Sequence, residues 1–299
     1  MCGIVGLFLK EAKFEPQLGR LVAPMLASMS ERGPDSAGFA VYGDSVPGAV
    51  KLTLRGTEAT DFEAIARDVA RLVGAPVSCR RHDTHAVIAV PAGQEGVVRD
   101  KLVSIAPGVA VISVGRRMEL YKEVGHPTEV AERFGFAQMC GTHAIGHTRM
   151  ATESAVTTNG AHPFSTGTDQ CLVHNGSLSN HNDLRRRLRH DGIAFATDND
   201  TEVAAGYLSW RMQQGMGLEA ALTAALCDLD GFYTFVVGTE TGFAVLRDPI
   251  ACKPAVMVET DTYVAFGTEY RALVELPGVA EGRVFEPEPA KVYVWERRA

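Results

Sequence analysis

The second residue of the chain is the first candidate for chemistry. Removal of Met1 is expected because Cys2 is small, and the mature chain would then begin with a cysteine. An α-amine titrates near about 7.7–8.0 and a thiol near about 8.5, so this amine can accept the thiol proton at neutral pH. Taken alone, Cys2 is explained more simply as a small residue after the start codon.

A second candidate is the pair Asn175-Gly176, which follows the apolar segment Gln170–His174. Asn-Gly is a common turn dipeptide, and by itself this pair predicts a hairpin turn after a strand. The alternative is an oxyanion site, with the Asn175 amide and the Gly176 backbone N–H donating to one oxygen. Donors of this kind stabilise charge that develops in a transition state.

Two further sites carry charges that suit an amino acid. Arg149 follows an apolar segment, and its guanidinium matches the geometry of a carboxylate, to which the Thr152 hydroxyl can add a donor. Asp200 stands before a helical pattern and can offset a substrate ammonium. Thr197 three residues earlier also makes a capping box with Asp200, which alone is the preferred interpretation.

The histidines and remaining cysteines do not indicate a metal site. His143 and His147 are four apart, but the segment lacks the glutamate of an HExxH motif and a third ligand. The six cysteines include no CxxC pair. Apart from Cys2 they are interpreted as small buried residues: Cys79, Cys140, Cys171, Cys227 and Cys252.

Composition restricts the class of protein. The chain has 299 residues, 46% of them hydrophobic and 22% charged, as in globular proteins. A net charge of -7 argues against nucleic-acid binding. No apolar stretch approaches the roughly 20 residues needed to span a membrane, and the N-terminus does not resemble a signal peptide. We therefore expect a soluble cytoplasmic protein.

Apolar periodicity predicts the elements that must position these side chains. Near the N-terminus it predicts a strand at 3–9, a helix at 16–30 and a strand at 36–42. Beyond residue 142 it predicts helices and short strands without parallel alternation, which favours helices stacked outside antiparallel sheets. The expected helices are 179–188, 201–214 and 218–229, and the expected strands 170–174, 232–238, 243–246, 255–258 and 263–267.

The middle of the chain has a different pattern. Strand, helix, strand, strand, helix and strand are predicted in succession at 50–54, 61–73, 77–81, 85–90, 95–105 and 109–114. This order matches a ferredoxin-like, or split βαβ, arrangement. We therefore expect residues 43–140 to form an inserted α/β subdomain, from which a strand and short helix at 118–134 lead back out.

The candidate residues also occur in the order of a known family. Five motifs, with additional similarity at 247–254 and 267–269, resemble the class II glutamine amidotransferases, which are N-terminal nucleophile hydrolases. These motifs are Cys2–Gly6, Arg32–Ser36, His147–Arg149, His174–Gly176 and Asp200–Glu202. The resemblance covers residues 2–42 and 141–299, leaving out only the insert.

This resemblance implies an α+β fold, a four-layer αββα sandwich, that hydrolyses glutamine to glutamate and ammonia. Cys2 would be the nucleophile, and Asn175 and Gly176 would stabilise the oxyanion. Arg149 and Thr152 would bind the α-carboxylate, and Asp200 the α-ammonium. Arg32 matches a family position too and is expected to order the loop near Cys2. The sequence departs from the family at Met150, Glu153, His181, Ala251 and Lys253, none of which is a catalytic group.

The sequence shows no second synthase domain, so the ammonia is expected to be used by a partner subunit. A separate amidotransferase with a large insert resembles the small subunit of glutamate-synthase-type complexes such as N-methylglutamate synthase. In those complexes FMN and iron–sulfur clusters lie on other subunits, and this chain is expected to bind no cofactor. Two alternatives remain open: an amidase of another substrate, and a non-catalytic assembly subunit. The insert could bind a regulator or, more simply, dock partners.

Overall fold

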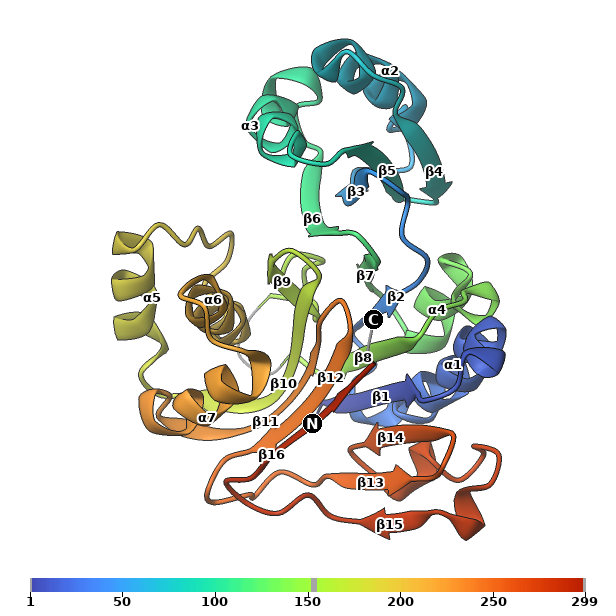
Figure 1. The fold of residues 1–299 in the computed structure, drawn as a ribbon, viewed down its shortest axis with the longest axis vertical. Coiled ribbons are helices and arrows are strands. Elements are labelled where there is room, and N and C mark those ends of the chain that lie inside the picture. The colour runs from blue at the N-terminus through green and yellow to red at the C-terminus, as the bar shows by residue number, and fades with distance from the viewer. Residues whose placement is uncertain (1, 152–154, 298–299) are drawn as a thin grey trace.

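A computed structural model describes residues 2–151 and 155–297 (Figure 1). Two antiparallel sheets face each other at its centre, and helices cover both outer faces. The predicted αββα sandwich is therefore confirmed. Thr152, one of the predicted carboxylate-binding residues, lies outside the described residues.

The first sheet has seven strands in the order β15-β13-β14-β1-β8-β2-β7. Its central strand, β1, follows Cys2 directly and pairs antiparallel with β8 and β14. The seven strands are β1 Gly3–Leu9, β2 Ser36–Tyr42, β7 Met118–Val124, β8 His143–Arg149, β13 Val256–Glu259, β14 Tyr263–Gly267 and β15 Arg283–Phe285. The site residues Cys2 and Arg149 thus stand at ends of neighbouring strands.

The second sheet has five strands in the order β16-β12-β11-β10-β9. They are β9 Phe164–Gly167, β10 Gln170–Leu178, β11 Gly231–Gly238, β12 Gly242–Arg247 and β16 Val292–Glu296. The edge strands β9 and β16, like β15 of the first sheet, are not among the predicted strands. These edge strands are short, so they carry little periodicity for sequence analysis to detect.

Three hydrophobic clusters separate the four layers. The first lies between the seven-stranded sheet and helices α1 Leu18–Ser28 and α4 Pro127–Arg133. The second fills the space between the sheets, and the third packs the five-stranded sheet against α5 His181–His190, α6 Asp200–Gln213 and α7 Leu218–Asp228. In Figure 1 these last three helices lie together on one side of the sandwich and α1 and α4 on the other.

The sequence of β1 explains why it can lie at the centre. Val5, Leu7 and Leu9 belong to the cluster under α1, whereas Ile4 and Phe8 belong to the cluster between the sheets. Alternate side chains of a strand point to opposite faces, so every residue of β1 is buried. Gly6 is needed at this point because a Cβ would lie 2.7 Å from the Phe243 ring.

The insert forms a third sheet, of four strands in the order β4-β5-β3-β6. Its elements are β3 Ala49–Arg55, α2 Phe62–Val73, β4 Ser78–His82, β5 His85–Pro91, α3 Glu95–Ile105 and β6 Ala110–Gly115. All adjacent pairs are antiparallel, and a βαββαβ chain with this strand order is ferredoxin-like. The predicted subdomain fold is confirmed, and Figure 1 shows it above the sandwich.

The segment predicted as the insert, residues 43–140, takes part in more than this sheet. β7 pairs along its whole length with β2 of the sandwich, from Ser36 opposite Val124 to Tyr42 opposite Met118. Helix α4 packs in the cluster beneath the same sheet. Strand β7 therefore belongs to the seven-stranded sheet while it runs directly beside the insert.

Two local predictions are wrong. The N-terminal helix begins at Leu18 rather than residue 16, because Ala12–Gln17, which contains Pro16, forms a 3-10 turn. The cysteines are also mostly not core residues: Cys171 is buried, Cys79 is half-buried, and Cys140, Cys227 and Cys252 are exposed. Within the described residues, no helix combines the length and the apolarity needed to cross a membrane.

Candidate active site

Cys2 is held through its backbone carbonyl. This oxygen accepts hydrogen bonds from Arg32 Nε at 3.0 Å and from Asn175 Nδ2 at 3.3 Å. The thiol itself is 3.9 Å from the carbonyl oxygen of Met150. Cys2 thus joins three segments that are distant in the sequence, and its sulfur is half-buried at their meeting point.

Asn175 and Gly176 do not form the hairpin turn that the dipeptide predicts. Strand β10 continues through both residues to Leu178 and stays paired with β11. Gly176 has φ +144, and a Cβ there would lie 1.9 Å from the carbonyl oxygen of Phe232. Only glycine fits this backbone without strain. The pair is therefore a distortion inside a strand, which the close approach of β11 requires.

The Asn175 side chain is oriented by contacts on the first sheet. Its Nδ2 is 3.2 Å from Thr268 Oγ1, and the same hydroxyl accepts the backbone N–H of Ile4 at 2.8 Å. These bonds turn the N–H donors of Asn175 toward the start of β1. An amide donor held beside a thiol can stabilise negative charge that forms on an atom bonded to the sulfur.

Arg32 is the second side chain that holds the Cys2 carbonyl. Besides donating to the Cys2 carbonyl, its guanidinium forms an ion pair with Glu269, which also pairs with Arg271 at 2.7 Å. Arg32 does not line the cleft beside Cys2. Arg32 therefore contacts the backbone of Cys2, and its supporting role stays a prediction.

Arg149 ends β8 and is largely buried, opposite Ser36 of β2. Its backbone is continued by an ordered turn, in which the carbonyl of Arg149 accepts from Asp35 N at 3.1 Å. The Asp35 carboxylate in turn accepts from Ala151 N at 2.8 Å. The motif that contains Asp35 therefore positions the chain on both sides of Met150, next to the Cys2 thiol.

Asp200 is the first residue of α6, but it does not act as the predicted cap. Asn199 caps the helix, its side chain accepting from Thr201 N at 2.8 Å, and Thr197 bonds to Glu202 instead. One Asp200 oxygen accepts Leu178 N at 3.0 Å. The capping-box interpretation is wrong because the chain bends at residues 196–198 and the Thr197 hydroxyl donates to Glu202. The Asp200 carboxylate is left at the cleft edge.

A cleft of about 660 Å³ brings these residues together. Its lining includes five of the seven predicted site residues: Cys2, Arg149, Asn175, Gly176 and Asp200. Its lining holds one thiol, one guanidinium and two carboxylates, those of Asp198 and Asp200. Such a cavity can bind a small zwitterion with its side chain directed at the sulfur. Within the described residues, no group of three potential ligands could hold a metal ion.

Three buried histidines stand at the cleft, His162 and His174 in its lining and His147 behind it, and none is among the predicted site residues. The rings of His147 and His162 lie 4.1 Å apart, and His147 Nε2 donates to the carbonyl of His174 at 3.2 Å. Burial lowers the pKa of all three, that of His147 to about 3, so their rings are neutral. His147 and His174 belong to the family motifs His147–Arg149 and His174–Gly176, and these motifs are the sequence signal that points to them.

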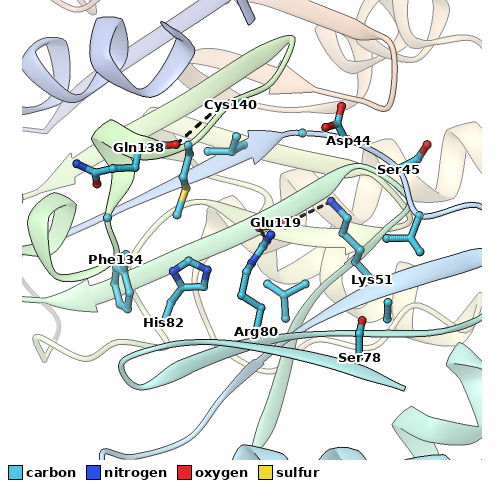
Figure 2. Close-up of a pocket in the computed structure, with 17 residues that line it drawn as sticks. Asp44, Ser45, Lys51, Ser78, Arg80, His82, Glu119, Phe134, Gln138 and Cys140 are labelled. Atoms are coloured by element: carbon cyan, nitrogen blue, oxygen red, sulfur yellow. Dashed lines mark hydrogen bonds and ion pairs between the residues drawn. The ribbon is translucent and has the colours of Figure 1, made fainter. Parts of the chain in front are cut away.

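A second cavity, of about 530 Å³, separates the insert from the sandwich. Figure 2 shows Arg80 and Lys51 of the insert directed at Glu119 of β7 across this space. Burial alone would raise the pKa of Glu119, but the charges of Lys51 and Arg80 outweigh it and hold the pKa below its ordinary value. This cavity does not include Cys2 and marks the junction between the two parts of the chain.

The αββα sandwich, with a cysteine at the start of its central strand, has the N-terminal nucleophile hydrolase fold. Two solved structures share it: glutamine phosphoribosylpyrophosphate amidotransferase of B. subtilis (TM-score 0.62, 20% identity) and an allosteric regulatory enzyme of purine biosynthesis (TM-score 0.63, 19% identity). Each comparison covers 99% of this chain but 47% of the other, so the chain spans about half of each.

Relatives of similar length are closer in sequence. The glutamine amidotransferase-like protein GlxB of Rhizobium meliloti (strain 1021) is 59% identical over 100% of this chain and 99% of its own. A putative glutamine amidotransferase of Methanothermobacter thermautotrophicus is 32% identical over 98% of this chain and 99% of its own length. The model of the glutamine amidotransferase domain matches residues 147–275. The chain belongs to the class II glutamine amidotransferases, a family of enzymes.

Proposed function

We propose that this chain is a glutaminase subunit that hydrolyses glutamine with the Cys2 thiolate. After removal of Met1, the α-amine of Cys2 takes the thiol proton, and the sulfur attacks the side-chain amide carbon of glutamine. The C–N bond breaks as the same amine returns a proton to the leaving ammonia. Water then hydrolyses the thioester, releasing glutamate and restoring the thiol.

The observation that carries this proposal is the pair of hydrogen bonds on the Cys2 carbonyl, which holds this residue beside the Asn175 amide. Asn175 Nδ2 and the Gly176 N–H are the proposed oxyanion donors. Tyr233, opposite Gly176, uses its N–H and C=O on Asp248, on the far side of β11. Gly176 and Tyr233 therefore form a non-hydrogen-bonded pair of the antiparallel ladder. The N–H of Gly176 then points away from β11 and is not used by the sheet on that side.

Recognition of the substrate follows from the charges at the cleft. We assign the α-carboxylate of glutamine to Arg149, whose fork matches two carboxylate oxygens, with Thr152 as a further donor. The α-ammonium is assigned to Asp200, which lies at the start of α6 and is about a quarter exposed at its side chain. The two charges select a free amino acid rather than an acylated one.

The proposal extends to the fate of the ammonia. We propose that it passes to a partner subunit in a glutamate-synthase-like complex, of which N-methylglutamate synthase is the model. FMN and iron–sulfur clusters would then be carried by the partner subunits. The match to relatives along their full lengths supports a separate amidotransferase subunit as a recurring unit.

Intact mass spectrometry with the glutamine analogue diazo-oxo-norleucine tests the catalytic part. We expect a chain without Met1 that gains one adduct, mapped to Cys2, while Cys2→Ala gains none. The exposed Cys227 supplies a control, because Cys227→Ala should be labelled like the unchanged protein. An adduct elsewhere, or none on a chain that begins with Cys2, would overturn the assignment.

Purification from the native cell tests the complex. A tag on the C-terminus leaves Cys2 free, and a flavin-containing partner is expected to be recovered with the chain. Glutamine-dependent activity of that complex should be lost with Cys2→Ala and restored by added ammonium. Recovery without a flavoprotein would reject the proposed complex, and full glutamine-dependent activity with Cys2→Ala would indicate an assembly subunit instead.

A further inference from the structure

The insert is tied to the wall of the Cys2 cleft by side chains. Arg55, the last residue of β3, donates from Nη1 to Asn159 Oδ1 at 2.9 Å. Thr84, in the turn between β4 and β5, donates to Glu123 Oε2 at 3.4 Å, and the other oxygen of Glu123 accepts from Thr158. Two independent connections thus lead from the insert to residues 158 and 159.

Residues 158 and 159 are flanked in the chain by residues that line the cleft. Thr157, Gly160 and His162 are part of the cleft wall, so residues 158 and 159 lie directly between them in the chain. A shift of the insert that moves residues 158 and 159 must therefore displace the cleft wall as well. The wall segment is defined here as residues 157–163.

The same segment is held from inside the sandwich by Lys122 of β7. Its buried amine donates to the carbonyl of Ala161 at 2.7 Å and to those of Asn159 and Pro163 at 3.3 Å each. Glu123, the next residue of β7, contacts the insert and the wall segment together. Successive residues of a strand point to opposite faces of the sheet. Lys122 therefore contacts the wall segment from one face of β7 and Glu123 contacts it from the other.

The insert itself is fixed on β7 at a second point. Glu119 is buried and paired with Lys51 of β3 at 2.8 Å and with Arg80 of β4, as Figure 2 shows. Glu119 and Glu123 lie four residues apart on β7 and hence on the same face. The position of the insert is therefore set beside Glu119 and is transmitted to the wall segment beside Glu123.

From these contacts we infer that the insert positions the glutamine-binding wall, with Arg55 and Glu123 as its positioning residues. This inference rests on the proposed glutaminase function. Neither residue lines the cleft, so both act through residues 158 and 159. The insert would then set the affinity of the cleft for glutamine, and whatever binds the insert in a complex would have a direct route to that affinity.

Kinetics of Arg55→Ala, Asn159→Ala and the double variant test the connection. One hydrogen bond to a charged group is expected to change the KM for glutamine about three- to tenfold, with kcat within about twofold. The double variant should be no worse than the more affected single one, because both remove the same bond. Arg55→Lys should recover part of the loss, since a lysine can still donate to Asn159 Oδ1.

Arg81→Ala is the matched control. Arg81 is also an insert arginine, but it donates to the carbonyls of Asp83 and Glu58, within the insert. It should leave the KM for glutamine unchanged. An equal rise in KM with Arg81→Ala would overturn the inference, because general loosening of the insert would then explain the effect.

Hydrogen exchange of the wall segment supplies a readout that does not need catalysis. Arg55→Ala should accelerate exchange in residues 157–163 and leave β3 itself unchanged, whereas Arg81→Ala should not. If Cys2 is not labelled and the protein is inactive, the proposed glutaminase function is wrong. Faster exchange of residues 157–163 in Arg55→Ala would even then establish the connection between the insert and the wall segment. If Arg55→Ala and Asn159→Ala both keep the wild-type exchange rates in residues 157–163 and the wild-type KM for glutamine, the inference is refuted.

Discussion

The side-chain amide of Asn175 lies 3.3 Å from the carbonyl oxygen of Cys2, although 173 residues separate the two in the chain. One residue opens β1 of the first sheet and the other lies in β10 of the second. Their contact therefore depends on the packing of the two sheets. It brings the Asn175 amide to the residue whose sulfur is the proposed nucleophile.

Asn175→Ala is expected to lower kcat for glutamine hydrolysis by about 10²–10³-fold and to change KM little, because the donor acts on transition-state charge. Asn175→Asp, which keeps the shape but loses the N–H donors, should be as poor. Asn175→Ala should retain the wild-type thermal transition within a few degrees. A loss of kcat smaller than about threefold would remove Asn175 from the oxyanion site.

Two charged residues of the cleft, Arg149 and Asp200, are expected to control substrate choice. Asp200→Asn still accepts Leu178 N but no longer offsets an ammonium, so KM for glutamine should rise more than tenfold at little cost in stability. The comparison with N-acetylglutamine is decisive. Wild-type protein should strongly prefer free glutamine, and Asp200→Asn should narrow this preference. Equal use of both substrates by the wild type would favour an amidase of another substrate.

Gly176→Ala is expected to disrupt folding as well as activity. The added Cβ would meet the Phe232 carbonyl at 1.9 Å, at a φ of +144 that alanine rarely adopts. We expect a loss of about 3 kcal/mol or more in the free energy of unfolding. Gly96→Ala is the control, because its Cβ meets nothing within 4 Å in helix α3, and alanine should stabilise by up to about 1 kcal/mol. Urea unfolding of both variants tests this.

Acid should weaken the fold through its buried histidines. Burial lowers the pKa of His85, His143 and His147 to about 3, against about 6.5 in an unfolded chain. The unfolded state therefore binds more protons below about pH 6.5. The free energy of unfolding should fall as the pH drops from 6.5 toward 3, by up to about 1.4 kcal/mol per pH unit for each histidine.

His143 is suited to testing this, because it lies away from the cleft and donates to the Thr239 carbonyl at 3.0 Å. His143→Gln should make the free energy of unfolding less dependent on pH between 6.5 and 4, even if it lowers stability at pH 7. The exposed His190 serves as a control, since His190→Gln should preserve the slope. An unchanged slope in the His143 variant would contradict the assignment.

Glu119→Gln should loosen the insert. The substitution leaves the buried Lys51 amine without its counter-charge, which typically costs about 3–5 kcal/mol in a buried pair. Hydrogen exchange should accelerate along β3 and β7, where the insert meets the sandwich. Glu129→Gln, at an exposed position of α4, should change neither strand. Equal exchange in the two variants would show that the Glu119 pairs contribute little.

Local pattern was sufficient for much of the architecture. The alternation in β1 and β11 and the strand–helix order of the insert appear in the sequence as they do in the structure, because burial of one face imposes its period on the residues. The interpretation of Asn175-Gly176 as a turn failed for the opposite reason. The dipeptide permits a turn, but pairing along β11 keeps β10 extended, and this pairing involves residues more than 50 positions away.

The order of its motifs indicated which residues of this chain are candidates for chemistry, since residue type alone decides which groups can attack, donate or carry charge. Only the tertiary structure decided how they meet. Two sheets must pack before Asn175 reaches Cys2, and the insert must settle on β7 before Arg55 reaches Asn159. Such contacts arise from the register and packing of distant strands, for which a local sequence pattern carries no signal.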